Sequence, residues 1–182
     1  GVLARTTKEY ILEAGQDGGI CSALGIHGMQ TGQLKGMVVG NEDPDNPQMG
    51  YAHLATTPEE VIASARSRYS YQPNTLVLVE AMKRGIAPLA VVGVPCQVDG
   101  VRQQQYSSIR LDVAEWYRQN IGLVIGLFCS EAFTEKGMDW LADDLGVSKR
   151  DVTNINIKGR LEIKLRDGRE ETRSLKAFGK YA

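Results

Sequence analysis

Two short apolar runs, PLAVVGV (residues 88–94) and IGLVIGLF (121–128), constrain the fold of this chain more than any other feature. Each has the length and composition of a buried strand, and amphipathic stretches typical of helices surround both runs. Strands that alternate with helices indicate an α/β protein with a mixed or mostly parallel sheet flanked by helices.

The same pattern predicts the other elements of this core. A short buried strand is expected at 36–40, followed by a polar, proline-bearing loop over 41–50 that leads into a loop holding His53. The clearest helix start is Thr57-Pro58-Glu59-Glu60, in which Thr57 caps the helix and Glu60 stands at the third helical position. Helices are expected over 20–32, 57–69, 75–85, 97–105, 111–120 and 134–146.

The texture of the sequence changes after about residue 150. VTNINIKG and RLEIKLRDGREETRSL alternate apolar and polar residues, and Asp167-Gly168 is a hairpin signal. We therefore predict a small antiparallel β element near the C-terminus. The expected division is an α/β core over residues 1–150 and a β-hairpin extension over 151–182.

Charge and cysteine content exclude several classes of function. The net charge is −1, which argues against a general nucleic-acid or membrane-surface binder. No apolar run approaches the roughly 20 residues of a membrane span, so no transmembrane segment is expected. Three cysteines form too sparse and odd a set for a disulfide framework and favour a reducing, cytoplasmic location.

Cys96 and Cys129 each stand at the exit of one of the two apolar runs. Neighbouring strand ends in an open α/β sheet converge on one crevice, so the two thiols meet if the strands are neighbours. Three roles are open at this point: small buried side chains, a redox-active pair, or two of the four thiolates that an iron–sulfur cluster normally takes. Pro95 ends the first strand. The helix that begins near Gln97 offers N–H donors to the sulfurs of such a cluster.

Two further segments have features of ligand binding. In AGQDGGICSAL (14–24) a Gly-Gly pair opens a helix, which lets backbone amides approach an anion; a plain turn before a helix is the alternative. SARSRYSYQPN (64–74) holds arginines that pair with phosphates and tyrosines that stack on flat rings, unless it is a solvated helix face. Cys21, His27 and His53 are expected to be structural.

These stretches together match one family. AGQDGGICSAL, TPEEVIASARSRYSYQPN, VVGVPCQVDGVR and IGLFCSEAF resemble, in order, the beta subunit of the coenzyme F420 hydrogenase/dehydrogenase family, from near residue 4 to about residue 177. The resemblance implies a flavoprotein with FAD and one [4Fe-4S] cluster. It implies hydride exchange with coenzyme F420 and electron transfer to iron–sulfur subunits of a hydrogenase, formate dehydrogenase or sulfite-reducing partner.

The resemblance also assigns residues. Cys96 and Cys129 look like two of the four cluster ligands, and the family's other two, a downstream Cys-x-x-Cys, are absent from a chain that ends at Ala182. We therefore expect a truncated chain. The residues implied for the FAD cradle at the helix start are Gln16, Asp17, Gly18, Gly19 and Ser22. Those implied for FAD or for the anionic tail of coenzyme F420 are Ser64, Arg66, Arg68, Tyr69 and Asn74.

Two alternatives to this function stay open. In the first alternative, a protein of the same fold uses a different electron donor, such as ferredoxin, or reduces another organic substrate. Otherwise the chain is a docking module without catalysis in a larger redox complex. No side chain stands out as a general acid or base, which suits chemistry carried by cofactors.

Overall fold

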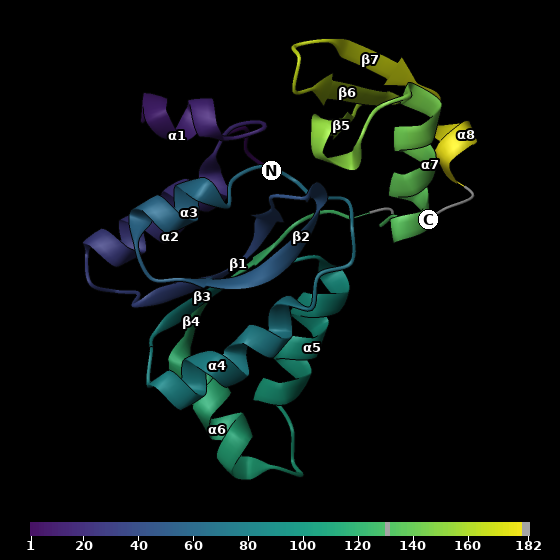
Figure 1. Ribbon diagram of the computed structural model, residues 1–182. Helices are drawn as coiled ribbons and strands as arrows, with labels where there is room; N and C mark the ends of the chain where they lie inside the picture. Colours follow the sequence, from purple (N-terminus) through teal and green to yellow (C-terminus); the bar gives the residue numbers. More distant parts are fainter. Residues whose placement is uncertain (130–131, 180–182) are drawn as a thin grey trace. The chain divides into compact units, whose positions relative to one another are not determined.

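The computed structural model describes residues 1–129 and 132–179 and confirms the α/β class (Figure 1). One sheet has four strands in the order β2-β1-β3-β4, in which β1 pairs parallel with β3 and β3 parallel with β4. A second, three-stranded sheet has the order β5-β6-β7 and is antiparallel, as expected for the C-terminal segment. Ser130 and Glu131 of the IGLFCSEAF stretch and the last residues of the 151–182 extension, 180–182, lie outside the described residues.

Contacts divide the chain into two compact units. The first unit comprises residues 1–40, 52–66 and 73–129, and the second comprises 41–51, 67–72 and 130–182. The boundary expected at residue 150 falls inside the second unit. Strands β1 (Gly36–Asp43) and β2 (Asn46–Ala55) contribute to both units.

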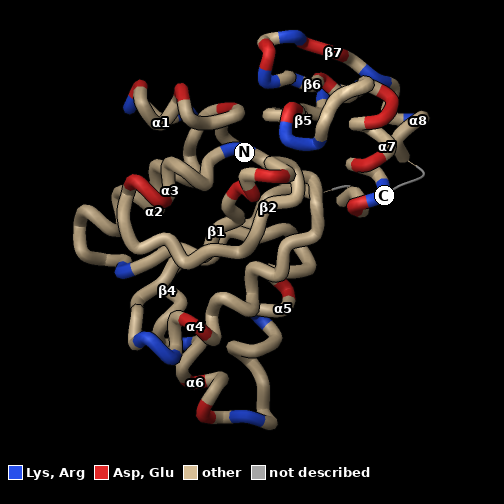
Figure 2. Tube along the Cα trace, viewed as in Figure 1, with Lys and Arg blue, Asp and Glu red and all other residues tan. Residues whose placement is uncertain are grey.

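The first unit is a sheet with apolar side chains on both faces. Its other elements are α1 (Glu9–Ala14), α2 (Ile20–Gln30), α3 (Pro58–Ala63), the 3-10 helix η1 (Asn74–Leu76), α4 (Val77–Arg84), β3 (Leu89–Gly93), α5 (Pro95–Gln105), α6 (Leu111–Asn120) and β4 (Ile121–Gly126). Val38 and Val91 join the core cluster formed with α4, α5 and α6, whereas Met37 and Ala90 join the one formed with α1, α2 and α3. The strands therefore lie between two helical layers, which explains why β3 and β4 are apolar without a charged residue (Figure 2).

The second unit has a separate core under its antiparallel sheet. Its elements are α7 (Glu135–Leu145), the 3-10 helix η2 (Lys149–Asp151), β5 (Val152–Ile157), β6 (Leu161–Leu165), β7 (Glu170–Arg173) and α8 (Leu175–Phe178). Phe133 and Phe178 are buried with ring centroids 4.2 Å apart. Acidic and basic residues are interspersed along β6 and β7, where Lys164 pairs with Glu170 at 2.9 Å (Figure 2). These charges form a solvated face.

Several expected helix starts and stops are confirmed. The Thr57 hydroxyl accepts the amide of Glu60, and the Glu60 carboxylate accepts the amide of Thr57, which completes the predicted capping box. Gly85 and Gly146 end α4 and α7 in the left-handed conformation. Among the described residues, no helix has the length and apolarity needed to span a membrane.

The polar loop expected over 41–50 is wrong, because this segment holds the facing ends of two strands and the two-residue turn of their hairpin. β1 continues to Asp43 and β2 begins at Asn46, so His53 lies in a strand rather than in a loop. The carboxylate of Asp43 accepts the amides of Asp45 at 2.8 Å and Asn46 at 3.3 Å. This side chain closes the turn locally, without the glycine that marks most hairpins in a sequence.

The helix expected to continue from Thr57 to Tyr69 is also wrong, because α3 ends at Ala63. The hydroxyl of Ser64, the C-cap residue, donates to the carbonyl of Val61 at 2.8 Å. Arg66 then adopts a left-handed backbone conformation with φ of 80°, which no α-helix accommodates. The strand expected over 121–128 likewise stops early, at Gly126.

Candidate cofactor site

The two cysteines at the strand exits lie at the same edge of the four-stranded sheet. The register pairs Gly93 of β3 with Gly126 of β4, and the amide of Leu127 donates to the carbonyl of Gly93 at 2.9 Å. Cys96 follows as the second residue of α5, and Cys129 follows the end of β4. Both cysteines are exposed and neither forms a disulfide. The structure therefore confirms that their strands are neighbours and argues against burial as the reason for either thiol.

The first turn of α5 is closed largely by its own groups. Pro95 occupies the first helical position, and the side-chain oxygen of Gln97 accepts the amide of Val94 at 3.1 Å. The amide of Gln97 donates to the carbonyl of Val94 at 2.9 Å. A Cβ on Gly93 would lie 2.9 Å from the Gln97 oxygen, so glycine makes room for this cap. The side-chain oxygen and the backbone N–H of Gln97 are thus both used in capping α5. Because Pro95 has no N–H, the amide of Cys96 is the first N–H of the helix.

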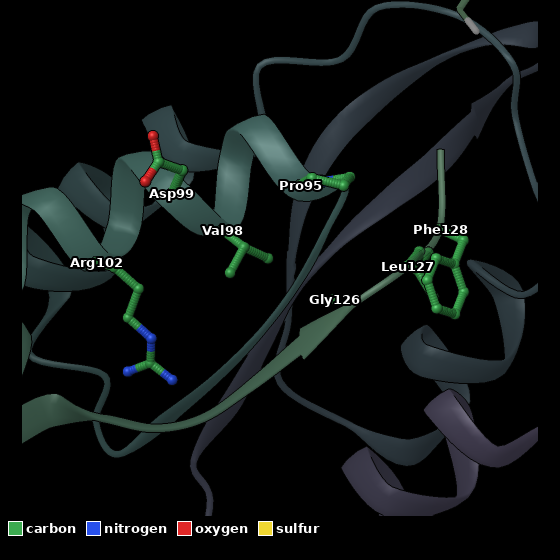
Figure 3. Close-up of a pocket in the computed structure, with 7 residues that line it drawn as sticks. All are labelled: Pro95, Val98, Asp99, Arg102, Gly126, Leu127 and Phe128. Carbon is green, nitrogen blue, oxygen red and sulfur yellow. The ribbon is translucent and has the colours of Figure 1, made fainter. Parts of the chain in front are cut away.

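A shallow groove of about 380 Å³ lies between α5 and the exit of β4 (Figure 3). Pro95 and Phe128, which line it, directly precede the two cysteines in the sequence. The remaining lining residues are Val98, Asp99, Arg102, Gly126 and Leu127. Sequence reasoning missed this groove because it placed Phe128 in a buried strand. Gly126, which interrupts the apolar run, was the available signal.

The donor set at this edge fits half of an iron–sulfur cluster. A [4Fe-4S] cluster takes four thiolates, and Cys96 and Cys129 are two exposed thiols that follow adjacent strands. The described part of the chain contains no group of three or more histidine, cysteine or acidic side chains that is placed to hold a metal. Cys21 is half-buried in α2, and burial raises the pKa of its thiol, which suits packing rather than ligation.

The Gly-Gly pair opens α2 as expected, and the structure gives each glycine a packing reason. Gly19 is the N-cap residue with φ of 67°, a conformation that disfavours any side chain. A Cβ on Gly18 would lie 2.8 Å from the carbonyl oxygen of Ala4, and the Gly18 carbonyl accepts the amide of Thr6 at 2.8 Å. The glycines thus allow residues 4–6 to pack against the turn.

The first backbone amides of α2 are nevertheless not capped by a side chain. The first α-helical bond of α2 runs from the amide of Ala23 to the carbonyl of Gly19, and Gly19 has no side chain to cap the amides before it. Gln16 and Ser22 are half-buried beside this turn, and Asp17 is exposed. These residues surround an electropositive helix start, the feature on which the anion-site prediction rests.

Residues 64–74 are divided between the two units. In the first unit Ser64 is buried, and Arg66 is exposed and donates from Nε to the carbonyl of Ala14 at 3.3 Å. In the second unit the Arg68 side chain is only 5% exposed and pairs with Glu42 at 3.1 Å. Arg68 therefore stabilises the end of β1.

Tyr69 and Asn74, the other two predicted residues of this stretch, are also engaged by the fold. Tyr69 packs against the core of the second unit, and its carbonyl accepts the amide of Phe133 at 2.6 Å. Asn74 lies in the first unit, is 8% exposed, and donates from Nδ2 to the carbonyl of Val92 in β3 at 3.4 Å. Its Oδ1 is buried without a hydrogen-bond partner. An orphaned acceptor beside β3 fits a ligand that brings a donor.

Two sequence profiles of one family match the chain and cover most of it. The profile described as "Coenzyme F420 hydrogenase/dehydrogenase, beta subunit N-term" matches residues 2–79, and the companion profile for the C-terminal part of the same beta subunit matches residues 86–182. The chain belongs to the coenzyme F420 hydrogenase/dehydrogenase beta-subunit family. This establishes the family that the motifs around Cys96 and Cys129 suggested.

Curated relatives within the beta-subunit family include the coenzyme F420 hydrogenase subunit beta of Methanosarcina barkeri, which is 34% identical over 99% of this chain and 62% of the relative. The coenzyme F420-dependent sulfite reductase of Methanocaldococcus jannaschii is 29% identical over 90% of this chain and 27% of that protein. This chain therefore spans about three fifths of the length of its hydrogenase relatives.

A solved structure has the same fold. A chain of the F420-reducing [NiFe] hydrogenase complex from Methanosarcina barkeri superposes with a TM-score of 0.87 and 32% sequence identity. The match covers 97% of this chain and 60% of that one. The beta-subunit family fold thus extends over nearly all of this sequence.

Proposed function

We propose that this protein is the flavin- and iron–sulfur-dependent electron-transfer subunit of an F420-linked oxidoreductase. The observation that carries the proposal is the family match over both parts of the chain, combined with two exposed thiols at adjacent strand exits. When bound, FAD exchanges a hydride with coenzyme F420 and passes on single electrons, which a [4Fe-4S] cluster accepts one at a time.

In this proposal the chain's own residues hold and orient the cofactors. Cys96 and Cys129 donate two thiolates, and the remaining ligands come from outside these residues. The amide of Cys96 at the tip of α5 stabilises the negative charge of the thiolates and sulfides. No general acid or base is assigned, because the hydride and the electrons move between cofactors.

The flavin is proposed to bind at the first unit's helix start and at Asn74. Gln16, Asp17, Gly18, Gly19 and Ser22 surround the uncapped amides of α2, which suit a diphosphate. The buried, unpartnered oxygen of Asn74 supports a ligand site in the same unit. Ser64 and Arg66, in the same unit, stay candidates for contacts to FAD or to the anionic tail of coenzyme F420. Arg68 and Tyr69, which the second unit engages through Glu42 and through its core, are separate candidates for the same ligands.

The proposed partners are iron–sulfur subunits of a hydrogenase or related dehydrogenase complex, by analogy with the hydrogenase and sulfite reductase relatives. We further propose a cytoplasmic location, since three cysteines outside any disulfide suit a reducing compartment.

A visible spectrum and rapid-mixing kinetics test the proposal. Protein that includes the remaining cluster ligands, purified without oxygen, should carry flavin bands and a broad iron–sulfur absorption. In stopped-flow mixing, reduced coenzyme F420 should bleach the flavin absorption rapidly, whereas NADPH and reduced ferredoxin should bleach it much more slowly. Faster bleaching by ferredoxin would support the alternative donor. A colourless protein that retains neither cofactor would contradict the proposal and favour a docking role.

A further inference from the structure

The side-chain amide of Asn74 has one polar atom, Nδ2, in a hydrogen bond and one, Oδ1, without a hydrogen-bond partner. The residue is 8% exposed and stands at the first position of η1, which packs against α5. Nδ2 donates to the carbonyl of Val92, a group that can only accept. This contact fixes which end of the amide is nitrogen, so the atom without a partner is Oδ1.

The free oxygen restricts the chemistry of any ligand that meets it. An amide oxygen accepts hydrogen bonds and offers none, so it does not bind a phosphate or a carboxylate. The resemblance assigned Asn74 either to FAD or to the anionic tail of coenzyme F420, and the anionic groups of that tail are incompatible with Oδ1. A neutral N–H or O–H group is the matching partner.

We propose that Asn74 Oδ1 accepts a hydrogen bond from a neutral donor of the bound flavin, either the ring imide N–H or a hydroxyl or amino group of the sugar and adenine. The inference rests on the proposed function, because it requires that the chain binds FAD. In the chain alone the oxygen is closed to solvent, so the residues around it must shift to admit the ligand. An unpaired buried acceptor in the cofactor-free protein is a cost that binding relieves.

The test compares Asn74→Leu with the wild-type protein in two measurements. FAD affinity, measured by flavin fluorescence, should fall roughly tenfold or more in the variant. The urea midpoint of the FAD-free protein should stay about equal, because removal of an unsatisfied buried oxygen offsets the loss of the 3.4 Å hydrogen bond from Nδ2 to the Val92 carbonyl. A purely structural role for Asn74 predicts the opposite pair: unchanged affinity and a lower midpoint.

Asn120→Ala is the matched control. Asn120 also donates from Nδ2 to a backbone carbonyl, that of Trp116 at 2.9 Å, but has no orphaned buried oxygen. Its substitution should leave FAD affinity unchanged. Equal losses of affinity in both variants would overturn the role of Asn74.

Flavin analogues identify the donor. Lumiflavin lacks the sugar and the adenine, and N3-methyl-FAD lacks the imide N–H. If the ring donates, Asn74→Leu weakens lumiflavin binding as much as FAD binding, and methylation weakens wild-type binding alone. If the sugar or adenine donates, only FAD binding depends on Asn74. Unchanged FAD binding in Asn74→Leu overturns the inference alone, whereas absence of FAD binding in the wild type overturns the proposed function and this role with it.

Discussion

Cys96 and Cys129 stand at the same interval beyond two glycines, Gly93 and Gly126, that are paired in the sheet. Parallel neighbours carry both chain exits to one edge, so residues that are distant in sequence leave the sheet side by side. The thiols are exposed there, next to a groove whose lining includes the residue before each of them. This arrangement suits ligation of a shared group better than packing.

In protein that includes the remaining cluster ligands, Cys96→Ser and Cys129→Ser should each remove the broad iron–sulfur absorption and leave the flavin bands. Because both side chains are exposed, the free energy of unfolding of the cofactor-free protein should change by less than about 0.5 kcal/mol. Visible spectra, iron analysis and urea unfolding measure these effects. Cys21→Ser is the control and should keep the iron–sulfur absorption. Loss of this absorption in Cys21→Ser, or its persistence in Cys96→Ser or Cys129→Ser, contradicts the assignment.

Phe128→Ala should leave stability unchanged, although phenylalanine is usually a core residue. The Phe128 side chain is fully exposed beside the groove, whereas Phe133 is fully buried against Phe178. Phe133→Ala should therefore lower the free energy of unfolding by about 3–5 kcal/mol. Urea unfolding compares the two variants directly, and a similar loss in both would show that Phe128 is covered in solution.

Gly18→Ala separates packing from cofactor binding. The added Cβ would lie 2.8 Å from the Ala4 carbonyl oxygen, so we expect a loss of about 1–3 kcal/mol in the FAD-free protein. Gly100→Ala, in the interior of α5 with no atom within 4 Å of the added Cβ, should instead stabilise by about 0.5–1 kcal/mol. If Gly18→Ala keeps full stability but loses FAD, the glycine serves the cofactor alone.

Glu60→Ala should destabilise the chain at neutral pH and not in acid. The backbone amide of Thr56 is the main cause that lowers the pKa of Glu60, and the Thr56 hydroxyl, the Thr57 amide and His53 lower it further. A lowered carboxylate pKa contributes stability above the unfolded pKa of about 4.3, which is lost as the pH falls through the folded pKa.

We expect a deficit of up to about 1 kcal/mol at pH 7 for Glu60→Ala, limited because the Glu60 side chain is 41% exposed. Urea unfolding at pH 7, 5 and 3 should show the deficit shrinking toward pH 3. Glu59→Ala, in the same helical turn, should show a smaller effect. A deficit that stays constant with pH would mean that the carboxylate charge is irrelevant.

Elements with strong local signals could be predicted from the sequence. The capping box at Thr57, the glycine stops at Gly85 and Gly146, and the apolar strands β3 and β4 each depend on residues within a few positions of one another. The capping box and the glycine stops act through local hydrogen bonds and backbone conformation, without any distant partner. The edge that gathers Cys96 and Cys129 followed from this α/β pattern.

The hairpin around Asp43 and the early end of α3 were missed for an equally physical reason. Asp43 closes its turn with a side-chain oxygen, and Ser64 ends its helix before an arginine in a left-handed conformation, so neither site carries the usual glycine. Residues with polar side chains support several backbone conformations, and neighbouring segments choose among them.

By itself the sequence determined the α/β class, the family resemblance and the two thiols at strand exits, because periodicity and short motifs express local preferences. Tertiary structure decided which polar groups stay available: it engaged Gln97 in a cap, paired Arg68 with Glu42, and left the Asn74 oxygen buried without a donor. Hydrogen-bond satisfaction depends on atoms brought together from distant parts of the chain, and no local pattern records it.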